Sequence, residues 1–514
     1  GLTPSDGELA VADDEPIALD TLEIIANSSL GDPWFAVGSV PYNFTAADCD
    51  PVLGGNQPCA NPIQAAVNFI SANGLIPTDR TVHVEVSPPG YNETVIIDGS
   101  LPYLATLKTL AGAGSSGAYS TAPSTTLTGK VIIQNMPGGF TLSGFDITNN
   151  DANTAVSSFS TGGVLKFQDL VIANTSTGQG LTVSSHSGSI ELRDVQVTRA
   201  GDESMLLASS GNITILNSSV THSVGGNTDT ANLWATSDNG AIQINTFTSS
   251  GSNGHGLLLS AKKGITLMNI TAYNNGDGVS GHGVSIGQSG GTVRLENVNA
   301  RLNDGDGIRI FNSGPVSLMD ILVENNAANG VFVDTCYWSV SACTGASSGT
   351  VTIKGLRTTS HAGDTGLYIE SRSSILVEDL YTSGNARGAE IYLRGSGTAT
   401  LYRVDVRSNS IYGIYTNVAG NIKADSLQVT NHSSGTATFG ARLYATGAVT
   451  LTNKYGDNIF SSNKGTGLEV ITNGSVQMNG INSESNAQYG VRIDNTGGSG
   501  SVKLKNVMTS NNNL

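Results

Sequence analysis

Short runs of alternating apolar and polar residues recur along the chain from Gly180 to the C-terminus. Each repeat has a small or turn residue, an apolar-x-apolar triplet such as 181–183, 308–310 or 331–333, a short turn and a second alternating run. Alternation with a period of two turns one face of a strand inward and the other outward. Each repeat is therefore expected to supply two short strands that bury one face each.

Successive triplets are mostly about 22 to 27 residues apart, which matches one circuit of a solenoid and neither a helix nor a sandwich. Equivalent strands then stack from coil to coil. The sequence thus predicts an all-β parallel β-helix of about 15 coils, a rod on the order of 70 Å long at the usual spacing of strands. Because each coil contacts only its neighbours, such a chain need not split into domains.

Asparagines close the circuit at similar distances before the next triplet. They stand at Asn275, Asn303, Asn325, Asn385, Asn409, Asn431, Asn463, Asn486 and Asn511. Side-chain amides in such positions can bond to their copies one coil away, as in other stacked-strand assemblies. Asparagine also tolerates the left-handed conformation of tight turns. A ladder and a set of turn formers are both open interpretations, and they lead to the same fold.

The composition argues against a nucleic-acid partner. The chain has 64 glycines, 13% charged residues and a net charge of -16, so it has no basic surface that could neutralise phosphates. No apolar run in the sequence is long enough for a membrane span. We expect neither a nucleic-acid partner nor a membrane span.

Two close pairs of cysteines, Cys49 with Cys59 and Cys336 with Cys343, lie in loop-like stretches. Free thiols or a metal site are the alternatives, but no histidine or cysteine companions stand at ligand spacing. A local disulfide in each pair indicates an extracellular or cell-surface location. N-glycosylation sequons permit modification without requiring it. They occur at Asn27, Asn43, Asn92, Asn174, Asn212, Asn217, Asn269, Asn431 and Asn473.

Residues 1–60 fall outside the repeat, and we expect an N-terminal extension there, either a linker or a flap, with a local disulfide. The segment 61–72 has a proline near its start and apolar residues on one face, which predicts a short amphipathic helix. A strand over 82–86 and the run Pro-Gly-Tyr-Asn-Glu at 89–93 follow.

The order of this helix, this strand and the Pro-Gly-Tyr-Asn-Glu run resembles the opening of pectin-lyase-like right-handed parallel β-helix proteins, and the later coils resemble their repeats. The resemblance covers about residues 61–514 and implies a right-handed coil whose helix caps the first strand edge. It does not specify an activity, because the superfamily includes lyases, glycoside hydrolases, epimerases, adhesins and inert stalks. The repeat still runs at residue 514, so we expect more coils, another domain or another subunit there, and self-association through that end.

Three segments are similar to signature motifs of polygalacturonase-type glycoside hydrolases: 227–229, the Gly-His-Gly around His282, and Arg309 with its following isoleucine. The paired aspartates that would complete the site are absent from the sequence, because 253–256 (Asn-Gly-His-Gly) stand in their place. An inverting hydrolase needs two carboxyl groups flanking the scissile bond. We therefore expect no catalytic residue, with His282 and Arg309 as the residual candidates.

A lyase would need a calcium cluster of carboxylates beside a basic residue. Asp277, Asp304 and Asp306 near Arg309 are the candidates for that cluster. Acidic residues at coil corners are more often solvated, so we expect no cofactor and keep calcium as the alternative.

The middle residue of each triplet points outward if its neighbours point inward. Aligned coil by coil, these positions predict an exposed stripe made of Arg309, Phe332, Tyr368, Tyr392, Tyr415 and Arg442. Such a stripe can stack on sugar rings, form the centre of a protein interface, or act as a ladder in which the rings stabilise one another.

Two functions follow from these observations. The first is a non-catalytic extracellular structural or adhesive rod of a larger secreted protein, with a polysaccharide or another surface protein as its partner. The second is a polysaccharide lyase or glycoside hydrolase of the pectin-lyase-like type, with carboxylates converging beside Arg309.

Overall fold

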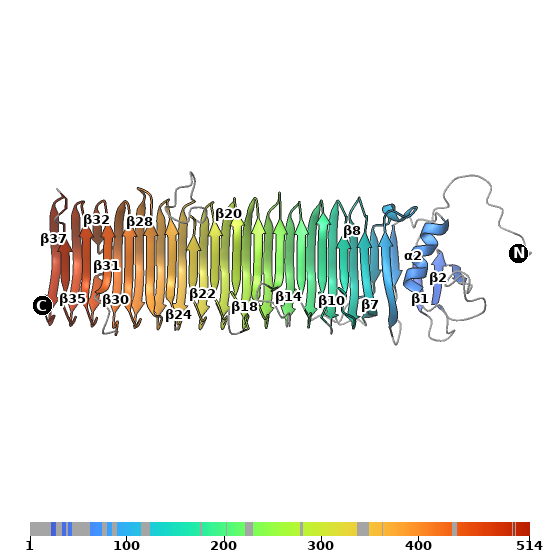
Figure 1. Cartoon of the computed structure of the whole chain (residues 1–514), viewed down its shortest axis with the longest axis horizontal. Coiled ribbons are helices and arrows are strands. Elements are labelled where there is room, and N and C mark those ends of the chain that lie inside the picture. Colours follow the sequence, from blue (N-terminus) through green and yellow to red (C-terminus); the bar gives the residue numbers. More distant parts are fainter. Residues whose placement is uncertain are drawn as a thin grey trace, which may run out of the picture.

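The computed structural model describes the chain in a series of ranges separated by short gaps. These are 22–26, 33–37, 40–43, 62–73, 80–84, 90–114, 124–174, 177–201, 203–221, 230–277, 281–336, 349–361, 363–433, 439–495, 497–498 and 500–513. Figure 1 shows them as a straight stack of strands with a helix at one end. The predicted all-β parallel solenoid of about 15 turns with one short N-terminal helix is confirmed.

Two kinds of strand alternate along the rod, as the repeat predicts. Strands that contain the apolar triplets pair in parallel with one another and form the triplet sheet. They are β9 (Val156–Phe159), β11 (Leu181–His186), β13 (Met205–Ser209), β15 (Ala231–Ser237), β17 (His255–Ala261), β19 (Val284–Ser289), β21 (Ile308–Asn312), β23 (Val331–Asp334), β25 (Thr365–Ser371), β27 (Arg387–Leu393), β29 (Tyr412–Val418), β31 (Phe439–Ala445), β34 (Thr466–Thr472) and β36 (Val491–Asp494).

Longer strands form the rest of the wall and also pair in parallel from coil to coil. They are β7 (Thr125–Gln134), β8 (Phe140–Asn149), β10 (Val164–Asn174), β12 (Ser189–Thr198), β14 (Ile213–Thr221), β16 (Ile242–Ser250), β18 (Gly264–Tyr273), β20 (Thr292–Arg301), β22 (Val316–Glu324), β24 (Val351–Thr359), β26 (Ile375–Ser383), β28 (Thr398–Arg407), β30 (Asn421–Thr430), the pair β32 (Val449–Thr452) and β33 (Asn458–Ser461), β35 (Val476–Glu484) and β37 (Val502–Ser510).

The long strands turn a corner near their middle. In β18, Leu267 and Ile270 are buried, while the two residues between them, Met268 and Asn269, face outward. Asn269 has a φ of 55°, a left-handed conformation that asparagine adopts more readily than most residues. Each coil therefore has three walls: the triplet sheet and the two halves of a long strand.

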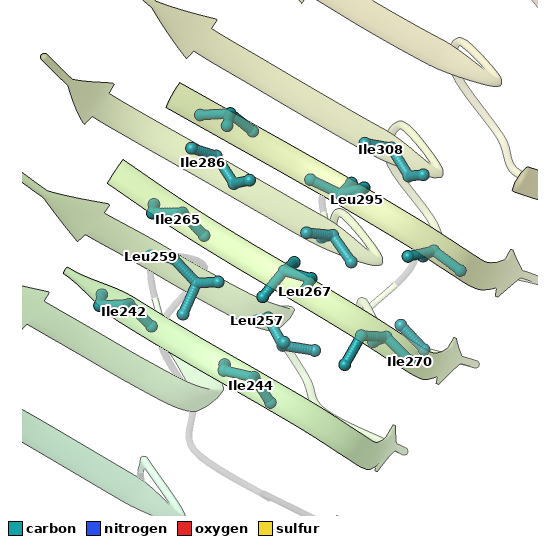
Figure 2. Packing of buried hydrophobic residues seen from close by; sticks show 14 of the residues in the cluster. Ile242, Ile244, Leu257, Leu259, Ile265, Leu267, Ile270, Ile286, Leu295 and Ile308 are labelled. Carbon is teal, nitrogen blue, oxygen red and sulfur yellow. The ribbon is translucent and has the colours of Figure 1, made fainter. Parts of the chain in front are cut away.

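Aliphatic side chains fill the inside of the coil along the rod. Leu257 pairs with Val284, which pairs with Ile308, and all three are fully buried. Figure 2 shows Leu257 and Ile308 among the isoleucines and leucines that reach inward from both kinds of strand. Burying one such side chain contributes about 1.5–3 kcal/mol, so each coil carries its own share of the core.

A buried amide ladder runs along one corner of the coil, which confirms the ladder interpretation of the asparagines. The side-chain amide of Asn275 donates to Oδ1 of Asn303 at 2.9 Å, and that of Asn303 donates to Oδ1 of Asn326 at 2.8 Å. Further along, Asn463 and Asn486 repeat the same bond at 2.9 Å. In each step, the backbone N–H of the donating asparagine also donates to the Oδ1 atom that accepts its side-chain amide.

Three of the predicted ladder positions are wrong by one residue. Asn325, Asn431 and Asn511 stand one position before the ladder and have φ between 53° and 62°. The ladder members in these coils are Asn326, His432 and Asn512. The turn former and the ladder member are thus two successive residues of one corner, and sequence alone does not separate neighbouring asparagines.

Helix α2 (Pro62–Asn73) lies at one end of the rod in Figure 1, as predicted for 61–72. Its N-terminus is capped by Glu93 of β5 (Tyr91–Asp98), whose two oxygens accept the backbone N–H groups of Ile63 and Gln64 at 2.9 and 2.8 Å. The glutamate of the Pro-Gly-Tyr-Asn-Glu run therefore supplies from a strand what an N-cap residue supplies in other helices. Burial raises the pKa of Glu93 to about 7 despite these two bonds.

The described part of the N-terminal extension contains three strands, β1 (Leu22–Ala26), β2 (Pro33–Val37) and β3 (Val40–Asn43), and its role as a flap or a linker stays a prediction. They pair with one another antiparallel, and β1 pairs in parallel with β4 (Thr81–Val84) of the first coil. The edge strand β4 is thus covered on its outer side by strand addition. The next coil begins with the short helix η1 (Leu104–Thr106) and β6 (Thr109–Gly112).

Candidate functional site: the outer rows of the triplet sheet

The outward face of the triplet sheet carries three rows of side chains. Strand pairing gives the central row as Ser285, Arg309, Phe332, Tyr368, Glu390, Tyr415, Arg442, Glu469 and Arg492. The edge row lies three residues earlier, where each strand begins, and includes His255, His282, Asp306, Asn329, Thr365, Arg387 and Tyr412. The far row lies two residues after the central row and includes Phe311, Asp334, Glu370, Tyr392 and Asn417.

The predicted stripe matches the central row at every position except Tyr392. Tyr392 lies in the far row, where it pairs with Glu370, and Glu390 takes the central position between Tyr368 and Tyr415. The expected register is wrong because the inward residue that opens β27 is Ala389. Because alanine is small and common on both faces of strands, it does not mark the first residue of an apolar triplet clearly. The stripe therefore contains a buried carboxylate that the sequence alignment misses.

The aromatic rings of the stripe contact one another across four consecutive coils. Phe332 and Tyr368 stack with ring centroids 4.8 Å apart and planes 3° apart. Tyr392 follows at 5.4 Å from Tyr368 and at 5.8 Å from Tyr415. These four rings are only half-buried. Phe332 and Tyr368 face each other, and the planes of the later pairs are tilted by 38° and 55°. The geometry favours the ladder interpretation, because faces used within the chain are not available for stacking on a sugar.

Two buried carboxylates of the central row are paired within the chain. Glu469 is buried and accepts from Nε of Arg442 at 2.5 Å and from Nη1 of Arg492 at 3.0 Å. Glu390 is buried and accepts from the hydroxyl of Tyr412, with Nε of Arg387 at 3.8 Å. Because the carboxylates are buried in these pairs, the polar groups that remain on the outward face are mainly hydroxyl and guanidinium groups.

The edge row forms a second ladder, and His282 and Asp306 belong to it. The backbone N–H of His282 donates to Nδ1 of His255 at 3.1 Å. The backbone N–H of Asp306 donates to Nδ1 of His282 at 2.8 Å, and that of Asn329 donates to Oδ1 of Asp306 at 2.9 Å. Each side chain thus binds the backbone of the following coil, which is a structural role.

Two donors nevertheless converge beside His282. Burial, aided by the nearby His255 and Arg309, lowers the pKa of His282 to about 3, so the ring is neutral. Because Nδ1 accepts the Asp306 N–H, the proton belongs on Nε2. Nη1 of Arg309, which only donates, lies 2.9 Å from that Nε2. An oxyanion lying to the side of both nitrogens would accept from each.

Arg309 itself is incompletely paired. Its Nε is buried and makes no hydrogen bond to any described residue; the nearest carboxylate oxygen, Oδ2 of Asp306, is 3.9 Å away. Its guanidinium lies over the rings of Phe311 and Phe332, at 4.7 and 5.8 Å from their centroids. Stacking on two rings holds the guanidinium in place with its nitrogen edge turned toward His282.

The calcium candidates do not assemble. Asp306 lies beside Arg309, but within the described ranges Asp277, Asp304 and Asp306 form no group that could hold a metal ion. Both Asp306 carboxylate oxygens face neighbours, since Oδ1 also accepts from the Asn329 side chain at 2.9 Å. Burial raises the pKa of Asp306. The absence of a cofactor stays a prediction, as does the role of 227–229, which lies outside the described residues.

The cysteine and glycosylation predictions are tested in part. Cys49, Cys59 and Cys343 lie outside the described residues, so both pairings stay predictions; the backbone N–H of Cys336 donates to Oδ1 of Asp334 at 2.6 Å. Asn174 is fully buried and donates to two backbone carbonyls, so the folded chain does not offer it for glycosylation.

The other sequons stay predictions. Asn27 lies outside the described residues and Asn43 ends strand β3. The rest are Asn92, Asn212, Asn217, Asn269, Asn431 and Asn473. Asn217, Asn269 and Asn431 stand at corners with φ between 48° and 62°.

Comparison with known proteins places the repeats in a family. The family model described as right handed beta helix region matches residues 183–344 and 340–514. Among solved structures, the A-module of the mannuronan C-5 epimerase AlgE4 from Azotobacter vinelandii is 13% identical, with 86% of this chain and 95% of that chain covered and a TM-score of 0.34. The AlgE6 A-module of the same organism is 12% identical, with 87% and 94% covered and a TM-score of 0.32.

A comparison with curated proteins finds no match. The likeness to the two epimerase modules is too distant to carry an argument about activity. Within the described part of the chain, no helix has the length and apolarity needed to cross a membrane.

Proposed function

The chain belongs to the right-handed β-helix family, and on that premise we propose that it is a non-catalytic structural rod of an exported or cell-surface protein. The observation that supports this proposal is that the polar side chains on the outward face of the triplet sheet bind neighbouring coils. His282 and Asp306 accept backbone N–H groups of the following coils, and Glu469 is enclosed by two arginines. Groups committed in this way hold coils together and are not free to transfer protons.

The carboxylates near Arg309 also argue against hydrolysis. Asp306 is bound by Asn329, and the next coil's Asp364 is paired with Arg387 at 2.9 Å. An inverting glycosidase needs one carboxyl group as acid and another that activates water. Neither Asp306 nor Asp364 is free for either task. Low charge, abundant glycine and two close cysteine pairs further support an extracellular rod.

Two measurements test the rod proposal. Mild protease treatment of intact cells should release fragments of the chain, or the culture medium should contain it; recovery from the cytosol alone would contradict export. The purified chain should show no turnover on a panel of neutral and uronic-acid polysaccharides, with and without calcium. Turnover that disappears in Arg309→Ala would replace the rod by the lyase or hydrolase alternative.

A second candidate function is binding of an acidic polysaccharide, and the convergence of Arg309 with His282 favours it. A carboxylate oxygen of a uronic acid lying beside Nη1 of Arg309 and Nε2 of His282 would accept from both. The half-buried tyrosines further along the stripe would add hydroxyl donors. In this candidate the partner is a surface polysaccharide, and no chemical step is involved.

Binding is measured by affinity electrophoresis in gels that contain polyuronate or a neutral glucan. We expect retardation by polyuronate alone, its loss in Arg309→Ala, and partial retention in Arg309→Lys, which keeps the charge without the fork of donors. Tyr392→Ala serves as the comparison, because it removes a ring of the stripe away from His282. Equal mobility of the wild type and Arg309→Ala would exclude this candidate and leave the rod proposal unaffected.

A further inference from the structure

Histidine interrupts the buried amide ladder in two coils. His361 and His432 occupy the position that asparagine occupies in the other coils, and their exposed fractions are 0% and 1%. Their ladder neighbours are Asn326 and Asn385 for the first, and Asn409 and Asn463 for the second. Histidine occupies the equivalent position in both coils, so the two rings have similar surroundings.

The bonding at these positions differs from that of the amides. The backbone N–H of Asn409 donates to Nδ1 of His432 at 3.2 Å, and that of Asn326 donates to Nδ1 of His361 at 3.2 Å. A ring that accepts at Nδ1 is neutral and carries its proton on Nε2. In both rings Nε2 has no hydrogen-bond partner among the described residues.

The histidine also deprives its neighbour of a partner. In an all-asparagine step, Oδ1 accepts both the backbone and the side-chain N–H of the preceding member, as Asn486 does for Asn463. His432 offers a single acceptor, which the backbone N–H of Asn409 uses. The side-chain nitrogen of Asn409 is accordingly buried without a partner in the described chain.

Little space surrounds the free edge of each ring. A Cβ built on Gly413 would lie 2.5 Å from Nε2 of His432, and one built on Gly330 would lie 2.7 Å from Nε2 of His361. Glycine at these positions leaves room for the imidazole but not for a counter-ion beside it.

The groups that face His432 are neutral. They are the ladder amides Asn409 and Asn463, Gly413 of β29 and the carbonyl of Val406 in β28. The segment 434–438 that follows contains no ionisable residue in the sequence.

His361 is likewise surrounded by neutral groups. The ladder amides Asn326 and Asn385 and the glycine Gly330 face it. The nearest acid along its own segment, Asp364, is paired with Arg387 at 2.9 Å. Burial lowers the pKa of both histidines, that of His432 to about 4.

We propose that His361 and His432 are acid-sensitive links, at which the rod opens locally when its surroundings become acidic. A proton added at Nδ1 removes the acceptor of the preceding coil's N–H. It also buries a cation beside neutral groups alone, since the atoms 3.3 Å from Nδ1 of His361 and His432 are the carbonyl oxygens of Asn326 and Asn409. An open coil lets the ring take its proton in water, where the pKa is near the ordinary 6.5 of histidine. Opening therefore becomes easier as the pH falls below this value, while coils linked by asparagine keep their bonds.

Amide hydrogen exchange of the wild-type chain at pH 7.5 and 4.5, corrected for the intrinsic rate, tests the proposal. Peptides from β28 to β31 and from β24 to β25 should open at least about tenfold more at the lower pH. Peptides of β35 and β36 around Asn486, a stretch of the chain without histidine, are the internal control for general acid effects and should change much less. Equal changes at histidine and asparagine coils would overturn the proposal without any variant.

Three variants test the links separately. His432→Asn should remove the acid response of its own coil and leave that of the His361 coil unchanged. Asn463→His should create a third responsive coil, and His83→Asn, outside the ladder, should change nothing. A His432→Asn chain that keeps the full acid response of β28 to β31 would also overturn the proposal.

Discussion

At the scale of the residue, the position of a side chain within the coil decides its role. Asn275, His282 and Asp306 have different chemistry, yet each accepts or donates a bond to the neighbouring coil. Coils stacked about 4.8 Å apart bring every side chain within reach of its counterpart. Residue types that indicate a catalytic site in a cleft can therefore serve in a solenoid to hydrogen-bond one coil to the next.

The triad of Glu469 with Arg442 and Arg492 allows this idea to be measured. Glu469→Ala leaves two guanidinium groups two coils apart without the carboxylate between them, and we expect the local free energy of opening to fall by about 1–2 kcal/mol. Hydrogen exchange across β31, β34 and β36 measures the change. Arg492→Ala is the matched control and should cost about 0.5 kcal/mol or less, because more than half of that side chain is exposed. An equal decrease of the opening free energy in both variants would contradict the role of Glu469 as the buried partner of both arginines.

At the scale of the element, helix α2 depends on a residue from another element. Glu93→Ala leaves the N–H groups of Ile63 and Gln64 buried or half-buried without an acceptor, at a cost of about 1–3 kcal/mol. Glu93→Gln retains one acceptor oxygen and should cost less. Exchange rates of the first helical turn report both changes, and unchanged rates in Glu93→Ala would show that the cap does not hold the helix.

The same residue gives the helix a pH dependence whose sign is fixed by its pKa. In the folded chain Glu93 titrates at about 7, and in the unfolded chain near its ordinary 4.5. Between these values the folded state binds more protons, so the contribution of Glu93 to the free energy of unfolding falls as the pH rises from 4.5 to 7. We expect helix exchange to accelerate over this window in the wild type and to be flat in Glu93→Gln, the reverse of the trend at the histidine links.

Most strands of the rod could be predicted because the alternation of apolar and polar residues is clear wherever both inward residues of a triplet are large. The errors arise where that signal weakens. Ala389 hides the start of the β27 triplet, and with it the central position of Glu390. Neighbouring asparagines such as Asn325 and Asn326 share one corner, and only backbone conformation tells which is buried.

The candidate site was less predictable than the fold. His282 and Arg309 do meet, as the motif similarity implied. That His282 stacks on His255 at 4.9 Å depends on coil register and not on any local motif. Strand β1 pairs with β4 across more than 50 intervening residues, a contact that no repeat signals.

At the scale of the whole molecule, the rod is a line of similar coils whose hydrophobic core runs along its length. Its stability should be close to a sum of terms for each coil and each contact between neighbours. A defect in one coil then affects its neighbours strongly and distant coils little. The acid response of two coils, the cap at one end and the guanidinium triad near the other are accordingly expected to act independently.

Leu318→Ala tests this independence near the middle of the rod. Leu318 is fully buried in β22 and pairs with Leu295 and Ile353 on either side, so truncation should cost about 2–5 kcal/mol. If coils are independent beyond their neighbours, hydrogen exchange accelerates in β20, β22 and β24 and stays unchanged near α2 and β35. Ser317→Ala, on the outward face of the same strand, is the control and should leave exchange unaltered. Uniform acceleration from one end to the other would mean that the coils unfold as a single cooperative unit, because only then does one cavity lower the opening free energy everywhere.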